Sequence, residues 1–384
     1  MTLPTGLSLV LLCLLSGFQS VGAQRSPAFP GLQGSGADTV GGGRGRILRV
    51  TSLEDHGAGT LRAACEMSGP RFVEFAVAGE ISLQTPIYIT EPHLTIDGES
   101  APGLITISSR DAVLDHAPFG LTTHDVIIRY INFAKGFNER FRRGQGPGNF
   151  ALWDKASNIV IDHCSFLWTQ DENVTLWGEL ENITFQWCLF AEPYDQHPTN
   201  VIVGPEGQLK RGIDFHHCLF ANASHRNPMF YEVEGRFVNN LIYNWDWFAV
   251  GLPTKGNRID FINNLWKPGP MTTMRKRREI SVTKEDQSLY LEGNVGPHSE
   301  GGQWAMVECI RGLRYEPVGK PVDPGSVQRR ERLPDPPFPI HIDAVEGLEE
   351  RVLAEVGASH HRSEADRRII EEYWQGRGGV PSGP

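Results

Sequence analysis

The sequence predicts a right-handed parallel β-helix, an all-β solenoid in which short strands wind into stacked coils. Three observations lead to this prediction. One strand pattern recurs along the middle of the chain, its residues are those that strands favour, and its copies follow one another at a nearly constant spacing. The 42 glycines and 26 prolines among 384 residues also favour many turns over long helices.

The recurring pattern is an apolar stretch, an inner Cys or Asn, and a second apolar stretch. Its alternation fits strands with one buried face and lacks the 3.6-residue period of helices. The copies are 126–134, 159–167, 183–191, 213–221, 237–243, 261–266 and 289–295. Their inner positions are Ile131, Cys164, Cys188, Cys218, Asn240, Asn264 and Asn294, with gaps of 33, 24, 30, 22, 24 and 30 residues. A baseline of 22–24 residues predicts coils of about three short strands, with insertions at the turns.

The inner column has a structural interpretation. Stacking places the inner residue of each coil over that of the coil before, so the Asn amides are expected to hydrogen-bond along the stack. Cys164, Cys188 and Cys218 are expected to be buried packing residues. Disulfides within the column are the alternative, although five cysteines remain after residue 23 and an odd number leaves one unpaired.

Residues 1–23 read as a signal peptide, with an apolar stretch at Leu7–Leu15 and small residues at Val21–Ala23. The segment is shorter than the roughly 20 residues of a membrane-spanning helix. We therefore expect a secreted or periplasmic protein without a membrane anchor. The alternative is a short anchor.

The remaining chain divides into two parts. Residues 24–315 are expected to form the β-helix, with the Gly-rich segment Ala28–Ala64 as a cap over the first coil. Residues 316–384 begin polar and proline-rich and end in a charged stretch, Ala344–Trp374, with helical character. This part is expected to be a short helical tail that packs on the solenoid.

The formal net charge is −10, which makes nucleic acid a poor partner. A local basic cluster at Arg140, Arg142 and Arg143 is either a solvated loop or a rim that attracts an acidic polymer. We expect a monomer.

The strings that carry the repeat also carry a family likeness. They are AFPG at 28–31, GGGRG at 41–45, GTLRA at 59–63, TIDGESAPG at 95–103, IVIDHCSFLWTQDE at 159–172, ITFQWCLFAE at 183–192, FHHCLFANASHRNP at 215–228, RFVNNLIYNW at 236–245, FINNLWKPGP at 261–270 and VLAEVGAS at 352–359. In this order they resemble bacterial pectate lyases of polysaccharide lyase family 1, in particular the pectate trisaccharide-lyase-like branch.

The resemblance implies a secreted lyase that cleaves polygalacturonate, or a related acidic polysaccharide of the plant type, by β-elimination. It implies Ca²⁺ as the cofactor, which makes the C5 proton of the uronate easier to remove. Arg226, in the string SHRNP, matches the arginine that the family uses as its base. The alternative for Arg226 is an arginine paired with a nearby carboxylate. Asp171 aligns with an acidic calcium ligand, and Glu172 is adjacent to it.

The sequence departs from the family pattern at several of these positions. Pro147 and Asn149 stand where members commonly have aspartates, and Thr175 stands where a second acid is expected. Asn149 still offers an amide oxygen to a metal. The usual substrate-binding lysine is missing, and His197 is expected to replace it in part, with Arg143 as a second substrate-binding residue. The calcium site is therefore expected to be weak.

Three alternatives remain beside the lyase. The first is a catalytically impaired β-helix that binds acidic polysaccharide without cleaving it. The second is a hydrolase on the same fold, although the sequence lacks the clustered aspartates that such enzymes need. The third is a purely structural solenoid. Asp162 and His163 are consecutive strand residues and are expected to point to opposite faces, so we expect His163 to link coils and not to form a dyad.

Overall fold

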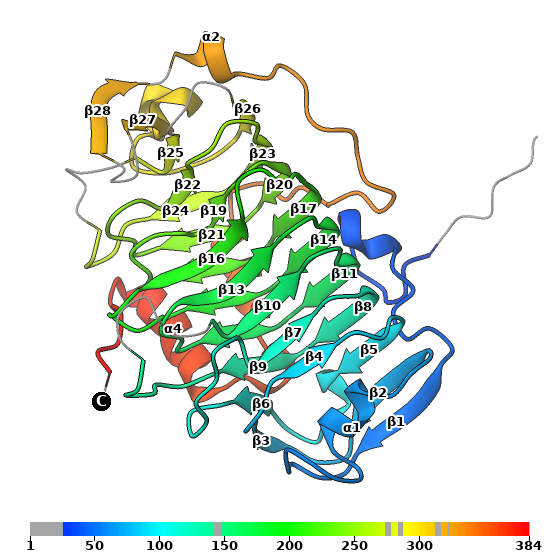
Figure 1. Cartoon of the computed structure of the whole chain (residues 1–384). Helices are drawn as coiled ribbons and strands as arrows, with labels where there is room; N and C mark the ends of the chain where they lie inside the picture. The colour runs from blue at the N-terminus through cyan, green and yellow to red at the C-terminus, as the bar shows by residue number, and fades with distance from the viewer. Residues whose placement is uncertain are drawn as a thin grey trace, which may run out of the picture.

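The computed structural model describes residues 26–141, 148–272, 278–282, 287–311, 316–321 and 323–383. The expected signal peptide lies outside these residues. The strands form three sheets that wind together into a parallel β-helix of stacked coils, as Figure 1 shows. The fold class predicted from the sequence is confirmed. No described helix is long and apolar enough to span a bilayer.

Most coils contribute one strand to each of the three sheets. Each sheet therefore runs the length of the solenoid. Sheet 1 consists of β1 (Arg46–Val50), β2 (Arg71–Phe75), β5 (Leu94–Asp97), β8 (His124–Arg129), β11 (Ser157–Asp162), β14 (Glu181–Gln186), β17 (Lys210–His216), β20 (Val233–Val238), β23 (Arg258–Ile262) and β26 (Ser288–Glu292). Sheet 2 consists of β3 (Gly79–Ser82), β6 (Ile105–Ser108), β9 (Ile131–Ala134), β12 (Ser165–Leu167), β15 (Leu189–Ala191), β18 (Leu219–Ala221), β21 (Leu241–Tyr243) and β24 (Leu265–Lys267).

Sheet 3 faces away from the other two and carries the site described below. It consists of β4 (Ile87–Ile89), β7 (Phe119–Leu121), β10 (Phe150–Trp153), β13 (Glu172–Trp177), β16 (Thr199–Gly204), β19 (Met229–Phe230), β22 (Val250–Leu252), β25 (Ile280–Val282), β27 (Val307–Arg311) and β28 (Glu316–Pro321). Only the last pair, β27 with β28, is antiparallel among the described strand pairs. Every other pair is parallel, because each strand returns to the same sheet one coil later.

The inner column forms the predicted ladder. Asn240 Nδ2 donates to Asn264 Oδ1, and Asn264 Nδ2 donates to Asn294 Oδ1, both at 3.0 Å. These amides also donate to strand carbonyls, so a buried polar column is satisfied within the core. Cys164, Cys188 and Cys218 are buried and free, and the cysteines of the described residues form no disulfide. The packing interpretation of the cysteines is confirmed.

A second column, on the outside of the turn between sheets 1 and 2, consists of one left-handed residue per coil. Tyr130, His163, Trp187 and His217 all have φ near +50°. Their rings stack from coil to coil with centroid separations of 4.7, 5.9 and 4.4 Å. His163 therefore links coils as expected.

The geometric argument about Asp162 was wrong. His163 Nδ1 lies 2.6 Å from Asp162 Oδ1, because the left-handed turn at His163 rotates its side chain back toward Asp162. Burial alone would raise the pKa of Asp162, but the contacts with His163 and Arg129 lower it to about 2. Asp162 is buried against Arg129, away from the cleft described below, which favours a structural role.

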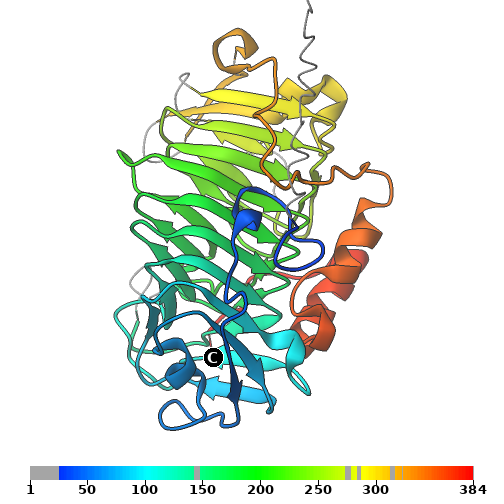
Figure 2. The same ribbon diagram turned by 90° about the vertical axis from the view of Figure 1, so that its right-hand side faces the viewer.

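The two ends of the chain return to the middle of the solenoid. Helix α3 (Leu348–Glu355) and helix α4 (Glu364–Gln375) pack on sheet 2, where Ile369 and Tyr373 of α4 are fully buried. Figure 2 shows these helices along one side of the coils. Arg368 of α4 pairs with the buried Glu192.

The N-terminal segment differs from the expected cap. Helix α1 (Leu61–Cys65) contacts the edge strands β1 and β4, as a cap would. The preceding 3₁₀ turn η1 (Ser35–Asp38) instead crosses sheet 1 and contacts β11, β14 and β17 in the middle coils. The backbone N–H of Ser35 donates to Asp214 on β17 at 2.7 Å, and that of Gly36 donates to Thr184 on β14. This crossing was not visible in the sequence, because its partners lie about 150 to 180 positions away.

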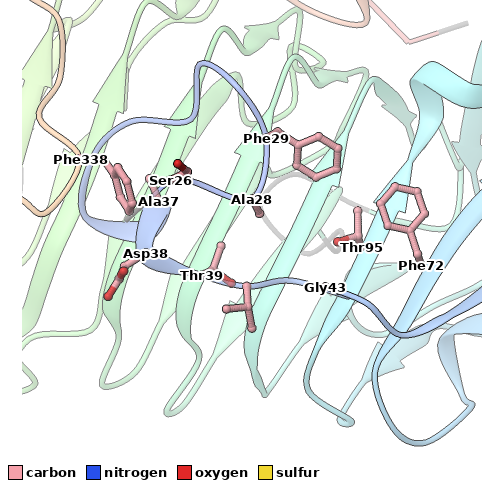
Figure 3. A pocket seen from close by; sticks show the side chains of 11 residues that line it. Ser26, Ala28, Phe29, Ala37, Asp38, Thr39, Gly43, Phe72, Thr95 and Phe338 are labelled. Carbon is pink, nitrogen blue, oxygen red and sulfur yellow. The ribbon is translucent and has the colours of Figure 1, made fainter. Parts of the chain in front are cut away.

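A cavity of about 620 Å³ lies beneath this crossing segment. Figure 3 shows its lining, with Phe29 and Phe338 from the chain ends and Phe72 from β2. Asp38 is its one ionisable lining residue. The cavity therefore offers packing space but no group of residues suited to catalysis.

Candidate active site

A separate cleft of about 600 Å³ lies on the outer face of sheet 3. Its floor is a row of outward-facing residues in register on adjacent strands, Ala151 on β10, Thr175 on β13 and Ile202 on β16. Because the row crosses successive coils, the cleft runs along the solenoid axis. The other lining residues are Asp115, His116, Ala117, Gly148, Trp153, Asp171, Glu172, Trp177, His197, Arg226 and Tyr231.

One side of the cleft carries the residues predicted to be functional. Asp171 and Glu172 are at the start of β13, His197 comes two residues before β16, and Arg226 comes three residues before β19. The three strands are neighbours in sheet 3, so the same edge of the sheet brings these side chains together. The sequence had placed them in three different coils.

Asp171, Glu172 and His197 form a cluster whose possible ligand atoms all lie within 4.8 Å of one another. His197 Nδ1 is 2.6 Å from Asp171 Oδ1. Both side chains are about a quarter exposed, at 23% and 24%, so they are accessible from the cleft. The cluster supplies two carboxylates and one imidazole to any cation or substrate that enters.

Arg226 closes this side of the cleft. Its Nη1 forms an ion pair with Oε1 of Glu172, so the paired arginine considered as an alternative is present in the structure. Arg226 Nε is buried and has no hydrogen-bond partner among the described residues. The backbone at Arg226 is left-handed, with φ of +59°, a conformation that costs a non-glycine residue on the order of 1 kcal/mol. Left-handed residues recur at the turns of this solenoid, so this conformation belongs to the coil geometry.

Asn149 does not join the cluster. It is buried, its Oδ1 accepts from the Lys135 backbone, and its Nδ2 donates to the carbonyls of Phe133 and Leu167. In the next coils Asn173 Nδ2 donates to Asn200, and Asn200 Nδ2 donates to Asn227. The Asn residues at this turn of successive coils thus hold the turn together by hydrogen bonds. Arg143 lies outside the described residues, as does Pro147.

The opposite side of the cleft was missed by the sequence reasoning. Trp153 and Trp177 face outward from β10 and β13 and are in register; we call this pair the tryptophan wall. Trp177 is 42% exposed. The two residues are 24 positions apart, which is the spacing of the coil repeat. That spacing was the available signal, since two Trp residues one coil apart must be neighbours.

Lys135 was also missed. It follows β9, is 2% exposed, and its Nζ has no hydrogen-bond partner among the described residues. Burial lowers the pKa of Lys135 to about 8, while the nearby Asp171 opposes that shift. A buried cation thus contributes to the field at Asp171.

Charge in the cleft is predominantly negative. Asp115, Asp171 and Glu172 are the acids that line it, and Arg226, already paired with Glu172, is the basic residue among them. A polyanionic ligand would be repelled by this set unless a cation accompanied it.

Comparison with known proteins finds relatives named pectate lyase C. The chain is 32% identical to the probable pectate lyase C of Neosartorya fischeri over 275 residues, which cover 70% of the chain and 60% of the fungal protein. It is 34% identical to the probable pectate lyase C of Emericella nidulans over 280 residues, or 72% and 60% of the two chains. The chain thus spans about three fifths of the length of these relatives. No protein-family model matches the chain.

Solved structures confirm the fold. The major allergen Jun a 1 of cedar pollen superposes with a TM-score of 0.64 at 15% identity, over 85% of this chain and 92% of the allergen. A pectate lyase from Bacillus sp. N165, solved with trigalacturonate, gives 0.56 at 14% identity, over 85% and 98%. A pectate lyase bound to a hexasaccharide gives 0.58 at 15%, over 86% and 97%.

The family resemblance inferred from the sequence is therefore confirmed. The chain is a parallel β-helix protein with an acidic, arginine-containing cleft on one sheet. Its sequence is similar to those of proteins named pectate lyase C, and its fold is that of solved pectate lyases.

Proposed function

We propose that the chain is a secreted polysaccharide lyase that cleaves polygalacturonate or a related uronate polymer by β-elimination. The observation that carries the proposal is Arg226, paired with Glu172 and gathered with Asp171 and His197 in a cleft that runs along the coils. It occurs in a chain 32–34% identical to proteins named pectate lyase C. Localisation outside the cytoplasm is proposed from the N-terminal apolar segment.

In the proposed reaction Arg226 accepts the proton from C5 of a uronate residue. The electron pair of the broken C–H bond forms the C4–C5 double bond, and the C4–O bond breaks. The leaving glycosidic oxygen takes a proton from water. A free guanidinium stays protonated in water. This role therefore requires Arg226 to lose a proton to water first. The ion pair with Glu172 opposes that loss, because it stabilises the charged guanidinium.

The cluster fits a weak calcium site. Asp171 and Glu172 offer carboxylate oxygens, which calcium prefers, and Oδ2 of Asp171 and Oε2 of Glu172 have no hydrogen-bond partner among the described residues. Calcium takes six to eight oxygens, so substrate carboxylates and water would have to supply the rest. Bound calcium would withdraw charge from the substrate carboxylate and so acidify the C5 proton. Asn149 is left out of the proposed site, because its amide is engaged by the backbone.

His197 is proposed as a substrate-binding residue. Its Nδ1 contacts Asp171, which leaves Nε2 as the atom able to meet a sugar hydroxyl or carboxylate in the cleft. Arg143 keeps its proposed role at the rim, outside the described residues.

The test is an assay for unsaturated uronate products. The secreted protein is incubated with polygalacturonate, with calcium or with a chelator, and absorbance near the product band is followed. Product that forms with the wild-type protein and disappears with Arg226→Ala supports the proposal. A protein that binds the polymer and releases no unsaturated product on any uronate polymer contradicts it and leaves the binding-only alternative.

A further inference from the structure

The tryptophan wall has no part in the reaction proposed above, yet its side chains are open to solvent. Trp177 is 42% exposed to solvent, and Tyr88, one coil before the neighbouring β7, is 36% exposed. Large aromatic side chains usually bury their area, and a contiguous exposed group of them marks an interaction site.

Glycines beneath the rings keep this surface flat. A Cβ added at Gly204, in register with Trp177, would lie 2.7 Å from Cζ3 of Trp177. A Cβ added at Gly120 would lie 3.0 Å from Cζ3 of Trp153 and 3.4 Å from Cδ1 of Tyr88. Each indole therefore rests directly on the backbone of an adjacent strand. Trp177 leans toward the following coil and Trp153 toward the preceding one.

The tryptophan wall extends along the cleft. The rings reach from Gly120 on β7, across β10 and β13, to Gly204 on β16. Three spacings between adjacent strands amount to about 14 Å, which is long enough for more than one sugar ring. Tyr88 supports the end of the wall, with its ring centroid 5.0 Å from that of Trp153 in an edge-to-face contact.

The wall lies opposite the reacting residues across the same floor. On β13, Trp177 follows Glu172 by five residues, which separates their Cα atoms by about 16 Å. Thr175, in the floor, lies between them and two residues before Trp177. A polymer that follows the floor past Arg226 therefore passes the tryptophan wall on its other side.

We propose that Trp153 and Trp177 form a sugar-binding subsite, on which the C–H faces of pyranose rings of the polymer stack beside the reacting residues. This inference rests on the proposed function for the identity of the polymer. It adds a chemical expectation: stacking contacts the ring and not the carboxyl group, so the wall accepts a uronate whether its carboxyl is free or methyl-esterified. Such a contact also avoids the negative charge of Asp115, Asp171 and Glu172.

The test compares Trp177→Ala and Trp153→Ala with Trp374→Ala as the control. Trp374 lies on α4, away from the cleft, and is 47% exposed, similar to Trp177. Trp177→Ala is expected to raise KM for the polymer about tenfold with kcat within about twofold, because a stacking contact binds ground state and transition state alike. Trp177→Phe should recover most of the loss, and Trp374→Ala should not change KM.

A binding measurement keeps this test separate from catalysis. Proteins carrying Arg226→Ala are run on native gels that contain polygalacturonate or its methyl-esterified form. Retardation by both polymers that weakens on adding Trp177→Ala supports the subsite, even if no variant ever cleaves the polymer. Unchanged retardation and unchanged KM in Trp177→Ala and Trp153→Ala, with the fold intact by circular dichroism, would overturn it. So would a loss confined to the unesterified polymer.

Discussion

His197 Nδ1 lies 2.6 Å from Asp171 Oδ1, although the two residues are 26 positions apart and belong to successive coils. The contact involves both departures from the family pattern, the missing lysine and the missing acids. Where the resemblance leads one to expect a lysine and further acids, this chain pairs a histidine with the acid that remains. The pair leaves Asp171 Oδ2 available to a cation and the far side of the imidazole available to a sugar.

Removal of the Asp171 carboxylate should weaken the dependence on calcium. Asp171→Asn keeps the shape but removes one charge, and calcium affinity falls as ligand charge falls. We expect the calcium concentration for half-maximal activity to rise at least about tenfold. Titration of calcium into chelator-treated protein measures it. Glu300→Gln, at an exposed acid outside the cleft, is the control. An unchanged calcium requirement would remove Asp171 from the metal site.

Substitution of Arg226 by glycine or by alanine should abolish activity equally but affect stability differently. Arg226→Gly removes the guanidinium and also the strain at φ of +59°, since glycine adopts this conformation freely. We expect activity to fall at least about a thousandfold in both Arg226→Gly and Arg226→Ala. The glycine variant should be more stable than the alanine variant by about 1 kcal/mol in denaturant unfolding. Equal stabilities would show that the turn carries no strain.

Loss of one Asn from the inner ladder should lower the free energy of unfolding by more than a single hydrogen bond contributes. Asn264→Ala leaves the Asn240 backbone N–H and the Phe237 carbonyl without their partners inside the core. Unsatisfied buried groups cost about 1–3 kcal/mol each, so we expect a loss of about 2–4 kcal/mol in the free energy of unfolding. Chemical denaturation measures the loss. Gln328→Ala, on an exposed side chain outside the ladder, should cost less than about 1 kcal/mol.

Acid should destabilise the protein through the His216–His217 pair. Burial lowers the pKa of His217 to about 4 and that of His216 well below its ordinary value of 6.5. Both are neutral in the fold, while the unfolded chain takes up their protons below about pH 6.5. Stability contributed by His217 is therefore complete above pH 6.5 and lost as pH falls toward 4, by up to about 3 kcal/mol.

The variant His217→Asn tests this pH dependence. Asn tolerates the left-handed conformation, and Asn239 occupies the same column one coil later. The fall in unfolding free energy between pH 6.5 and 4 should become shallower in this variant. If the slope stays the same, the acid sensitivity arises from other groups.

The repeat could be predicted from the sequence because each coil carries the same residue pattern at a nearly constant spacing. Inner residues at intervals of 22–33 positions fix which strands are neighbours, so the stacking of Cys218, Asn240 and Asn264 followed from counting. The cluster of Asp171, Glu172 and Arg226 was accessible only through the family likeness. The spacing of the repeat indicated which coils are adjacent, but it did not indicate which turn residues point into the cleft.

Other features escaped because they depend on backbone conformations that spacing does not reveal. The contact of Asp162 with His163 depends on a left-handed residue at a turn, where alternation of faces no longer holds. Asn149 looked like a weakened ligand, while its position at the turn before β10 directs its amide into the backbone. The tryptophan wall required noticing that two outward residues are one coil apart.

The return of both chain ends to the middle coils affects how the molecule unfolds. A solenoid whose coils contact only their neighbours can fray from its ends, one coil at a time. Here Gly34 donates to the Phe338 carbonyl at 2.8 Å, so the two extensions meet over sheet 1, while α4 binds the central Glu192 through Arg368. Loss of an end coil would therefore pull on contacts near the centre. The ties should convert gradual fraying into a single cooperative transition.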